Sequence, residues 1–207
     1  MVKKVIDMET KLVFEKQELA NGKKFIAGVD EVGRGPLAGP VCVAAVIMPL
    51  DDIIYGIDDS KKVSEKNREV LADEIKKRAI AYSIQMVDEQ TIDKINILQA
   101  TKLAMKKAIE GLSVKPDIVL VDAIDSLDVS VPIRGIIKGD AKSYSIGAAS
   151  ILAKVARDKL MIELDKEYPE YGFAKHKGYG TKQHIDAIKE NGPCVYHRLS
   201  FLKFLDE

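Results

Sequence analysis

The distribution of apolar and polar residues divides the chain into short apolar runs and longer segments with helical periodicity. Runs rich in Val, Ile and Ala, bounded by Gly, Pro, Asn or Asp, are typical of strands. A run without any polar residue indicates a central strand that is covered on both faces, and residues 118–121 form such a run. The predicted strands cover residues 25–29, 41–48, 81–87, 118–121 and 133–137.

The longer segments place apolar residues three or four positions apart, which predicts helices with one buried face. Ser64 is a typical N-cap residue, and Gly111 is a typical residue after a helix end. The predicted helices follow Ser64 as far as about residue 79, cover 88–110 in two pieces, cover 144–166, and run from the cap Thr181 to residues 191–193. This order predicts an α/β protein with a mixed five-stranded sheet flanked by helices.

We expect the chain to form one domain with a short extension. Its 207 residues, 46% of them hydrophobic, suffice for one compact core and are few for two. Residues 1–24 are charged and amphipathic and predict an N-terminal helical extension, which leaves residues 25–207 for the domain. We expect the apolar residues near the C-terminus, Leu199, Phe201, Leu202, Phe204 and Leu205, to dock on the core as part of a helical C-terminal region.

Composition narrows the setting in which the protein works. Cys42 and Cys194 are far apart and form neither a disulfide framework nor a paired metal motif, so we expect a reducing cytoplasm. No stretch approaches the length of a membrane span, and we expect a monomer without membrane contact. The net charge of zero argues against a nucleic-acid ligand, but residues 172–182 contain three lysines and no acid, so a local basic face can still form.

The segment from Gly28 to Pro40 carries the clearest chemical signal. It joins two adjacent carboxylates, Asp30 and Glu31, to a glycine-rich loop that holds one arginine, Arg34. Carboxylates next to a buried strand need a cation or strong hydrogen-bond donors, and a divalent metal is a natural partner. The glycines allow the backbone to approach a large ligand, and the Arg34 guanidinium can bind a phosphate with two hydrogen bonds.

Two further carboxylates follow predicted strands. Asp122 ends the strand at 118–121, and Asp140 follows the strand at 133–137. Taken singly, Asp122 is more typical of a turn and Asp140 of a helix start. Together with Asp30 and Glu31 they form an oxygen-only ligand set that suits Mg²⁺ or Mn²⁺, whereas the dispersed histidines do not form a zinc motif.

These residues, with further motifs along the chain, resemble the type 2 ribonucleases H, and ribonuclease HII in particular. The resemblance covers about residues 24 to 204 and rests on Gly28–Pro40, Asp59–Ser64, Val121–Ala123, Lys138–Asp140, Ala148–Asp158, His176–Thr181 and His197–Phe201. It implies a ribonuclease H-like fold. It also implies an endonuclease that hydrolyses RNA in RNA·DNA hybrids and nicks duplex DNA 5′ to an embedded ribonucleotide, giving 5′-phosphate and 3′-hydroxyl ends by two-metal catalysis.

The resemblance also implies roles for single residues. Asp30, Glu31, Asp122 and Asp140 would be the catalytic metal ligands, with Asp30 shared by the two ions and Glu31 acting partly through its backbone carbonyl. Gly33, Arg34 and Gly35 would recognise the ribonucleotide, and Tyr179 would contact the sugar at the RNA to DNA junction. We expect phosphate contacts from Ser60, Lys61, Lys62, Lys142, Lys177 and Lys182, whereas surface solvation is the competing interpretation for each lysine.

Other functions remain open at this point. A catalytically silent hybrid-binding module would be hindered by the four carboxylates, because they repel a polyanion. A sugar kinase or ATPase on a related fold lacks support, since no Gly-x-x-x-x-Gly-Lys-Ser/Thr loop occurs. Within the family, ribonuclease HIII is the alternative, although it normally carries a separate N-terminal substrate-binding domain and the 24-residue extension is too short to be one.

Overall fold

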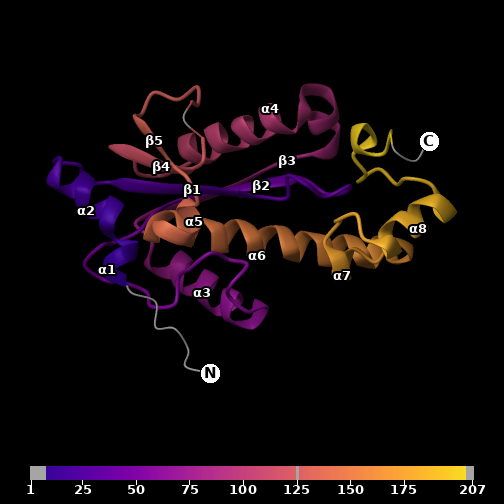
Figure 1. Ribbon diagram of the computed structural model, residues 1–207, viewed down its shortest axis with the longest axis horizontal. Coiled ribbons are helices and arrows are strands. Elements are labelled where there is room, and N and C mark those ends of the chain that lie inside the picture. Colours follow the sequence, from indigo (N-terminus) through magenta and orange to yellow (C-terminus); the bar gives the residue numbers. More distant parts are fainter. Residues whose placement is uncertain (1–7, 125, 204–207) are drawn as a thin grey trace.

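Five strands form one mixed sheet at the centre of the molecule. A computed structural model describes residues 8–124 and 126–203. The spatial order is β3-β2-β1-β4-β5, with β1, β2 and β3 antiparallel and β4 and β5 parallel to β1 (Figure 1). The strands are β1 (Ile26–Val32), β2 (Val41–Ile47), β3 (Ala81–Val87), β4 (Ile118–Asp122) and β5 (Ile133–Ile136). The predicted mixed five-stranded sheet is therefore confirmed.

Helices cover both faces of this sheet. Helix α4 lies on one face, and α6 lies on the other with α3 beside it (Figure 1). Helices α7 and α8 gather with the C-terminal segment at one end, and α1 and α2 lie at the other. The helices are α1 (Met8–Lys11), α2 (Val13–Ala20), α3 (Glu65–Arg78), α4 (Glu89–Glu110), α5 (Gly139–Lys142), α6 (Tyr144–Glu167), α7 (Phe173–His176) and α8 (Lys182–Asn191).

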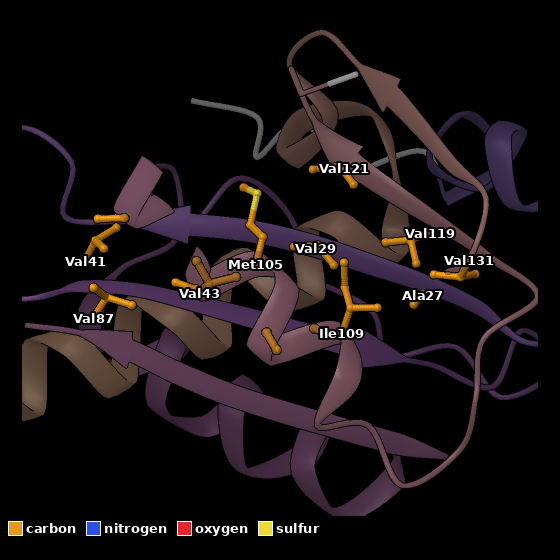
Figure 2. Packing of buried hydrophobic residues seen from close by; sticks show 14 of the residues in the cluster. Ala27, Val29, Val41, Val43, Val87, Met105, Ile109, Val119, Val121 and Val131 are labelled. Atoms are coloured by element: carbon orange, nitrogen blue, oxygen red, sulfur yellow. The ribbon is translucent and has the colours of Figure 1, made fainter. Parts of the chain in front are cut away.

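Alternation along the strands divides the core into two layers. Ala27 and Val29 of β1 face α4, where they pack with Met105 and Ile109 (Figure 2). The intervening positions face α6, so Asp30, which pairs with Ala44 of β2, lies on the α6 side of the sheet. The position of Asp30 within the strand thus determines which helix it meets.

Helix α6 lies very close to β1 at Gly28. A Cβ atom added to Gly28 would lie 2.1 Å from the Ser145 carbonyl carbon and 2.4 Å from the Ile146 amide nitrogen. Both are backbone atoms of the first turn of α6, and they cannot move away without displacing the helix. The absence of a side chain at Gly28 therefore sets the distance between α6 and the sheet.

Two boundaries differ from the sequence expectation or refine it. Strand β1 continues to Val32, so Asp30 and Glu31 are residues of the strand itself and not of the loop after it. The predicted division of α4 is confirmed at Asn96, which has a φ of 66°. The Asn96 side chain accepts hydrogen bonds from the amides of Leu98 and Gln99, so it caps the second piece of the helix.

The terminal segments agree in part with the prediction. The described part of the N-terminal extension forms α1 and α2, whereas residues 1–7 lie outside the described residues. Leu202 is buried at the C-terminus, but Leu199 is 61% exposed, so its predicted docking is wrong. Phe204 and Leu205 lie outside the described residues. No helix in the described ranges is long and apolar enough to cross a membrane.

Substituting Gly28 tests the close approach of α6. We expect Gly28→Ala to lower the free energy of unfolding by at least about 2 to 3 kcal/mol, because the methyl group overlaps helix backbone. Urea denaturation measures this loss. Gly35→Ala is the control, since a Cβ there would lie 3.9 Å from its nearest neighbour, the Tyr179 ring. Equal stability of the two variants would contradict the packing argument.

Candidate active site

The four carboxylates predicted from the sequence come together in one cleft. Strands β1 and β4 are parallel neighbours, so Asp30, Glu31 and Asp122 lie at the same edge of the sheet. Strand β5 is parallel to β4 and leads into α5, which brings Asp140 to that edge. The cleft has a volume of about 110 Å³ and is lined by Asp30, Glu31, Val32, Ser60, Lys61, Asp122, Asp140, Ser150, Lys154 and Tyr179.

Asp30 is the most buried of these carboxylates, with 6% of its surface exposed. Burial raises its pKa well above the ordinary value, and the nearby charges of Glu31, Asp122 and Asp140 raise it further. A hydrogen bond from Ser150 of α6 acts in the opposite direction. The cleft therefore concentrates negative charge around Asp30 with little compensation.

The other three carboxylates have partial compensation. Burial raises the pKa of Glu31, whereas the Arg34 guanidinium, with its Nη1 atom 3.4 Å from Glu31 Oε1, lowers it. Asp122 accepts a hydrogen bond of 2.7 Å from the Gly139 amide. Burial raises the pKa of Asp140, and the charges of Asp59 and Asp122 add to this effect. Backbone amides and one arginine thus orient these side chains.

The donor set fits a hard divalent cation. All four side chains offer carboxylate oxygens, the ligands that Mg²⁺ and Mn²⁺ prefer, and their mutual repulsion would be relieved by a cation. Within residues 8–124 and 126–203, no group of three or more His, Cys, Asp or Glu side chains already has the arrangement of a metal site.

A buried arginine holds the loop after β1 from the inside. Arg198 is fully buried, and its guanidinium donates to the carbonyls of Gly33 (2.6 Å), Arg34 (2.9 Å) and Gly39 (2.5 Å). In a trans peptide the N–H points opposite to the C=O. Because the carbonyls of Gly33 and Arg34 point inward, the amides of Arg34 and Gly35 point away from Arg198.

A second fully buried arginine, Arg157 of α6, extends this network. It donates to the carbonyls of Pro40 (2.9 Å), Ala38 (3.0 Å) and Lys177 (2.9 Å). Gly33 has a φ of +90°, and a Cβ there would lie 2.2 Å from Arg157 Nε. Glycine is therefore required at this position both for its conformation and for the approach of the guanidinium.

Two stacked histidines hold the segment that carries Tyr179. The Gly178 amide donates to His176 Nδ1 at 3.2 Å, so the ring proton of His176 is on Nε2, which donates to the Tyr171 carbonyl at 2.8 Å. The rings of His176 and His184 stack with centroids 4.4 Å apart. Tyr179 itself is 42% exposed and lines the cleft.

A chain of hydrogen bonds fixes the rings of His184 and His197. The Cys194 amide donates to His197 Nδ1 at 2.9 Å, so His197 Nε2 donates to His184 Nε2 at 3.1 Å. His184 Nδ1 then donates to the Tyr179 carbonyl at 3.0 Å. Each ring nitrogen has a defined role, and each of these imidazoles is neutral with one tautomer.

The structure places the predicted phosphate contacts in different environments. Lys61 is exposed at the cleft, and Lys142 is exposed on α5. The Lys177 ammonium donates to the Ala174 carbonyl, and Lys182 is paired with Asp186 at 2.5 Å. The remaining two are Ser60, which is buried with its hydroxyl 3.0 Å from that of Ser150, and Lys62, which is exposed near Asp59.

Sequence reasoning missed several residues that shape the cleft. The Ser150 hydroxyl contacts Asp30 and Ser60. Lys154 lines the cleft and pairs with Asp158 at 2.7 Å. The signal was the spacing of four between Ser150, Lys154 and Asp158, which puts three polar side chains on one side of an otherwise apolar helix.

Comparison with known proteins identifies the family. The family model described as Ribonuclease HII matches residues 27–204. The chain belongs to the ribonuclease HII family. It is 59% identical over 192 residues to the ribonuclease HII of Caldicellulosiruptor saccharolyticus, an alignment that covers 92% of this chain and 94% of that protein.

Solved structures of ribonucleases agree with this assignment. The ribonuclease H2 of Pyrococcus horikoshii OT3 has a TM-score of 0.73 and 26% identity, covering 88% of this chain and 98% of that one. The ribonuclease HII in the PCNA complex from Archaeoglobus fulgidus has a TM-score of 0.74 and 27% identity, covering 85% and 94%. The expected ribonuclease H-like fold is confirmed.

Membership in the family decides between the alternatives. A ribonuclease HII is an endonuclease that acts on RNA·DNA hybrids, so the chain is an enzyme of this type and not a silent binding module. A kinase or ATPase is excluded on the same ground. The identity of 59% to a ribonuclease HII also favours ribonuclease HII over ribonuclease HIII, the alternative within the family.

The histidine chain predicts a pH dependence of stability. Burial lowers the pKa of His184 and of His197 to about 4 each, whereas an unfolded histidine titrates near pH 6.5. Between these values the unfolded chain binds protons that the folded chain does not, so this contribution to stability is lost as the pH falls from about 6.5 to about 4. The raised pKa values of the carboxyl groups in the cleft have the opposite effect, because they make the folded state more stable as the pH falls.

Replacing one histidine isolates its contribution from that of the carboxylates. We expect the slope of unfolding free energy against pH to be smaller in His184→Gln than in the wild type, by up to about 1.4 kcal/mol per pH unit. Urea denaturation at several pH values between 4 and 6.5 measures this slope. The control is Lys189→Gln on the exposed side of the same helix, which should keep the wild-type slope. An unchanged slope in His184→Gln would disprove the assignment of a neutral buried ring.

Proposed function

We propose that the enzyme uses two divalent ions, Mg²⁺ or Mn²⁺, to hydrolyse the RNA strand of RNA·DNA hybrids. We further propose that it nicks duplex DNA 5′ to an embedded ribonucleotide and leaves 5′-phosphate and 3′-hydroxyl ends. The corresponding process is ribonucleotide excision repair, carried out by a monomer in the cytoplasm. The observation that supports this function is the convergence of Asp30, Glu31, Asp122 and Asp140 in one cleft beside Tyr179.

The four carboxylates would divide the ligand positions between two ions. Asp30, which is central and interacts with the other three, would be the shared ligand, while Asp122 and Asp140 would each serve one side. Glu31 lies on the opposite face of β1 from Asp30 and would contribute partly through its backbone carbonyl. Bound ions of this kind activate an attacking water and stabilise the leaving 3′-oxygen.

Recognition of the ribonucleotide would fall to the loop after β1. Arg198 turns the carbonyls of Gly33 and Arg34 inward, so the amides of Arg34 and Gly35 can donate to a sugar oxygen. The 2′-hydroxyl is the only group that distinguishes a ribonucleotide from a deoxyribonucleotide at one sugar. Tyr179, exposed at the cleft, would contact the sugar at the RNA to DNA junction.

Basic side chains around the cleft would bind phosphates. Arg34, Lys61 and Lys142 are exposed, and of these three Arg34 would first have to leave the Glu31 carboxylate. Lys177 and Lys182 would first have to leave the Ala174 carbonyl and Asp186 respectively. The Ser60 hydroxyl would serve as a neutral donor from the floor of the cleft.

Removing the shared carboxylate tests the metal assignment. We expect Asp30→Asn to reduce cleavage by roughly a hundred- to a thousandfold, since loss of metal stabilisation costs several kcal/mol in the transition state. The wild type should cut an RNA·DNA hybrid. It should also cut a DNA duplex that contains one ribonucleotide, at the 5′ side of that ribonucleotide, and it should not cut an all-DNA duplex.

Stability provides the internal control for this variant. Asp30→Asn removes a buried, repelled charge, so the melting temperature should equal or exceed that of the wild type, and hybrid binding should persist. Retention of a tenth of wild-type cleavage in Mg²⁺ would rule out Asp30 as a shared ligand.

Tyr179 tests the recognition of the junction. We expect Tyr179→Ala to impair cleavage at a single embedded ribonucleotide more than cleavage within a continuous hybrid, because one 2′-hydroxyl offers fewer alternative contacts. Loss of a stacking partner costs roughly 1 to 3 kcal/mol, or about five- to a hundredfold in rate. Initial rates on the two substrates measure the difference.

Two matched variants separate stacking from other effects. Tyr179→Phe keeps the ring and should retain the wild-type ratio of cleavage rates on the two substrates. Lys61→Ala removes a phosphate contact and should weaken binding of both substrates alike, with less dependence of binding on salt. Equal losses on both substrates for Tyr179→Ala, together with a lower melting temperature, would indicate a tyrosine that only packs.

A further inference from the structure

The N-terminal helices contact the segment that carries Asp140. Lys11 of α1 is 5% exposed, and its ammonium donates to Asp58 Oδ1 at 2.5 Å and to the Asp140 carbonyl at 3.3 Å. Helices α1 and α5 pack against each other. The family match begins at residue 27, so this contact comes from a part of the chain outside the matched domain.

Lys11 lies between two acidic segments that repel each other. Asp58 and Asp59 precede Ser60 and Lys61, which line the cleft from one side, and Asp140 lines it from another. The Asp59 and Asp140 carboxylates interact unfavourably. A buried cation that bonds to both segments offsets this repulsion and fixes the distance between them.

The Asp140 carbonyl is confined at this point. A Cβ atom on Gly147 of α6 would lie 3.2 Å from the Asp140 oxygen and 3.1 Å from Ile57 Cγ2. The carbonyl therefore rests against the α6 backbone next to the segment of Asp58. A hydrogen bond from Lys11 in so confined a place restrains the backbone of the metal ligand itself.

A second buried side chain of the same extension holds the other end of α5. The Glu15 carboxylate is fully buried and accepts from the Ser143 hydroxyl at 2.5 Å and from the Ser145 amide at 2.9 Å. The Ser143 amide donates a hydrogen bond to the Gly139 carbonyl, which closes the last turn of α5. The Ser143 side chain also caps the start of α6. Helix α5 is thus restrained at both ends by residues of α1 and α2.

We propose that the N-terminal extension is part of the active-site framework, with Lys11 as a positioning residue for Asp140. Lys11 does not touch substrate. It ties α5 to the Asp58 segment, so that Asp140 stays in place against the repulsion of its neighbours and is ready to bind a metal ion. This inference rests on the proposed role of Asp140 as a metal ligand.

The test compares two buried charged residues of the same extension. Lys11→Met removes the tie to α5. Glu18→Gln is the matched control, because Glu18 is 5% exposed and pairs with Arg134 of β5 at 2.6 Å, which anchors the extension without contacting α5. Both variants loosen the N-terminal helices, but only the first releases Asp140.

We expect Lys11→Met to weaken Mn²⁺ binding, measured by calorimetry without substrate, by about tenfold or more, and to lower kcat on the hybrid by a similar factor. Amide hydrogen exchange across residues 138–143 should become faster. Glu18→Gln should lower the melting temperature without changing Mn²⁺ affinity, kcat or exchange in this segment.

Two outcomes would overturn the inference: unchanged exchange and Mn²⁺ affinity in Lys11→Met, or equal changes in Glu18→Gln. Lys11→Gln, which retains hydrogen-bond donors but not the charge, gives the same comparison if Lys11→Met does not fold. Hydrogen exchange does not depend on catalysis. If the wild type showed slow exchange across residues 138–143 but did not bind Mn²⁺, the proposed function would be contradicted, whereas the contact of Lys11 with α5 would not.

Discussion

The close approach of α6 to β1 at Gly28 is the constraint on which the site depends. With the first turn of α6 against the strand backbone, the next residue on the same face of β1, Asp30, lies beside Ser150 of that helix. Lys154 follows one turn later in the cleft, and Arg157 follows it under the loop after β1. A single helix thus positions the Asp30 carboxylate, the Lys154 ammonium and the loop after β1.

Electrostatics gives the cleft and the loops beside it opposite characters. The cleft gathers carboxylates whose charges are incompletely balanced, which favours binding of cations. Behind the loops, Arg157 and Arg198 are buried against backbone carbonyls, with no carboxylate among the hydrogen-bond partners described above. Carbonyl dipoles stabilise these charges there, and the loop amides are left to face outward.

The sequence predicted the sheet and the main helices because their apolar periodicity is strong. It also predicted that Asp122 and Asp140 belong with Asp30 and Glu31, because all four follow or end predicted strands and together form an oxygen-only ligand set. It could not predict that Arg198 and Arg157 act on carbonyls, since their partners are up to 165 residues away and backbone atoms leave no sequence signal. The contact of Lys11 with Asp140, 129 residues away, was hidden for the same reason.

Misplaced expectations have equally local causes. Strand β1 was expected to end at residue 29 because charged residues usually mark a strand end, but pairing with β2 continues as far as Val32. Leu199 was expected in the core because of its apolar neighbours, yet its amide and that of Ser200 bond to Asp93, which holds the turn at the surface. Hydrogen bonds between segments far apart in the sequence explain both positions.

The two buried arginines have a consequence for motion. Arg157 joins the segment at residues 38–40 to Lys177, and Arg198 joins residues 33–39 to the C-terminal segment. Opening any one of these segments would leave a buried guanidinium with unpaired donors, which is costly. The loop after β1 and the segment of Tyr179 are therefore coupled through the donors of Arg157, and we expect them to open together although they lie far apart in the sequence.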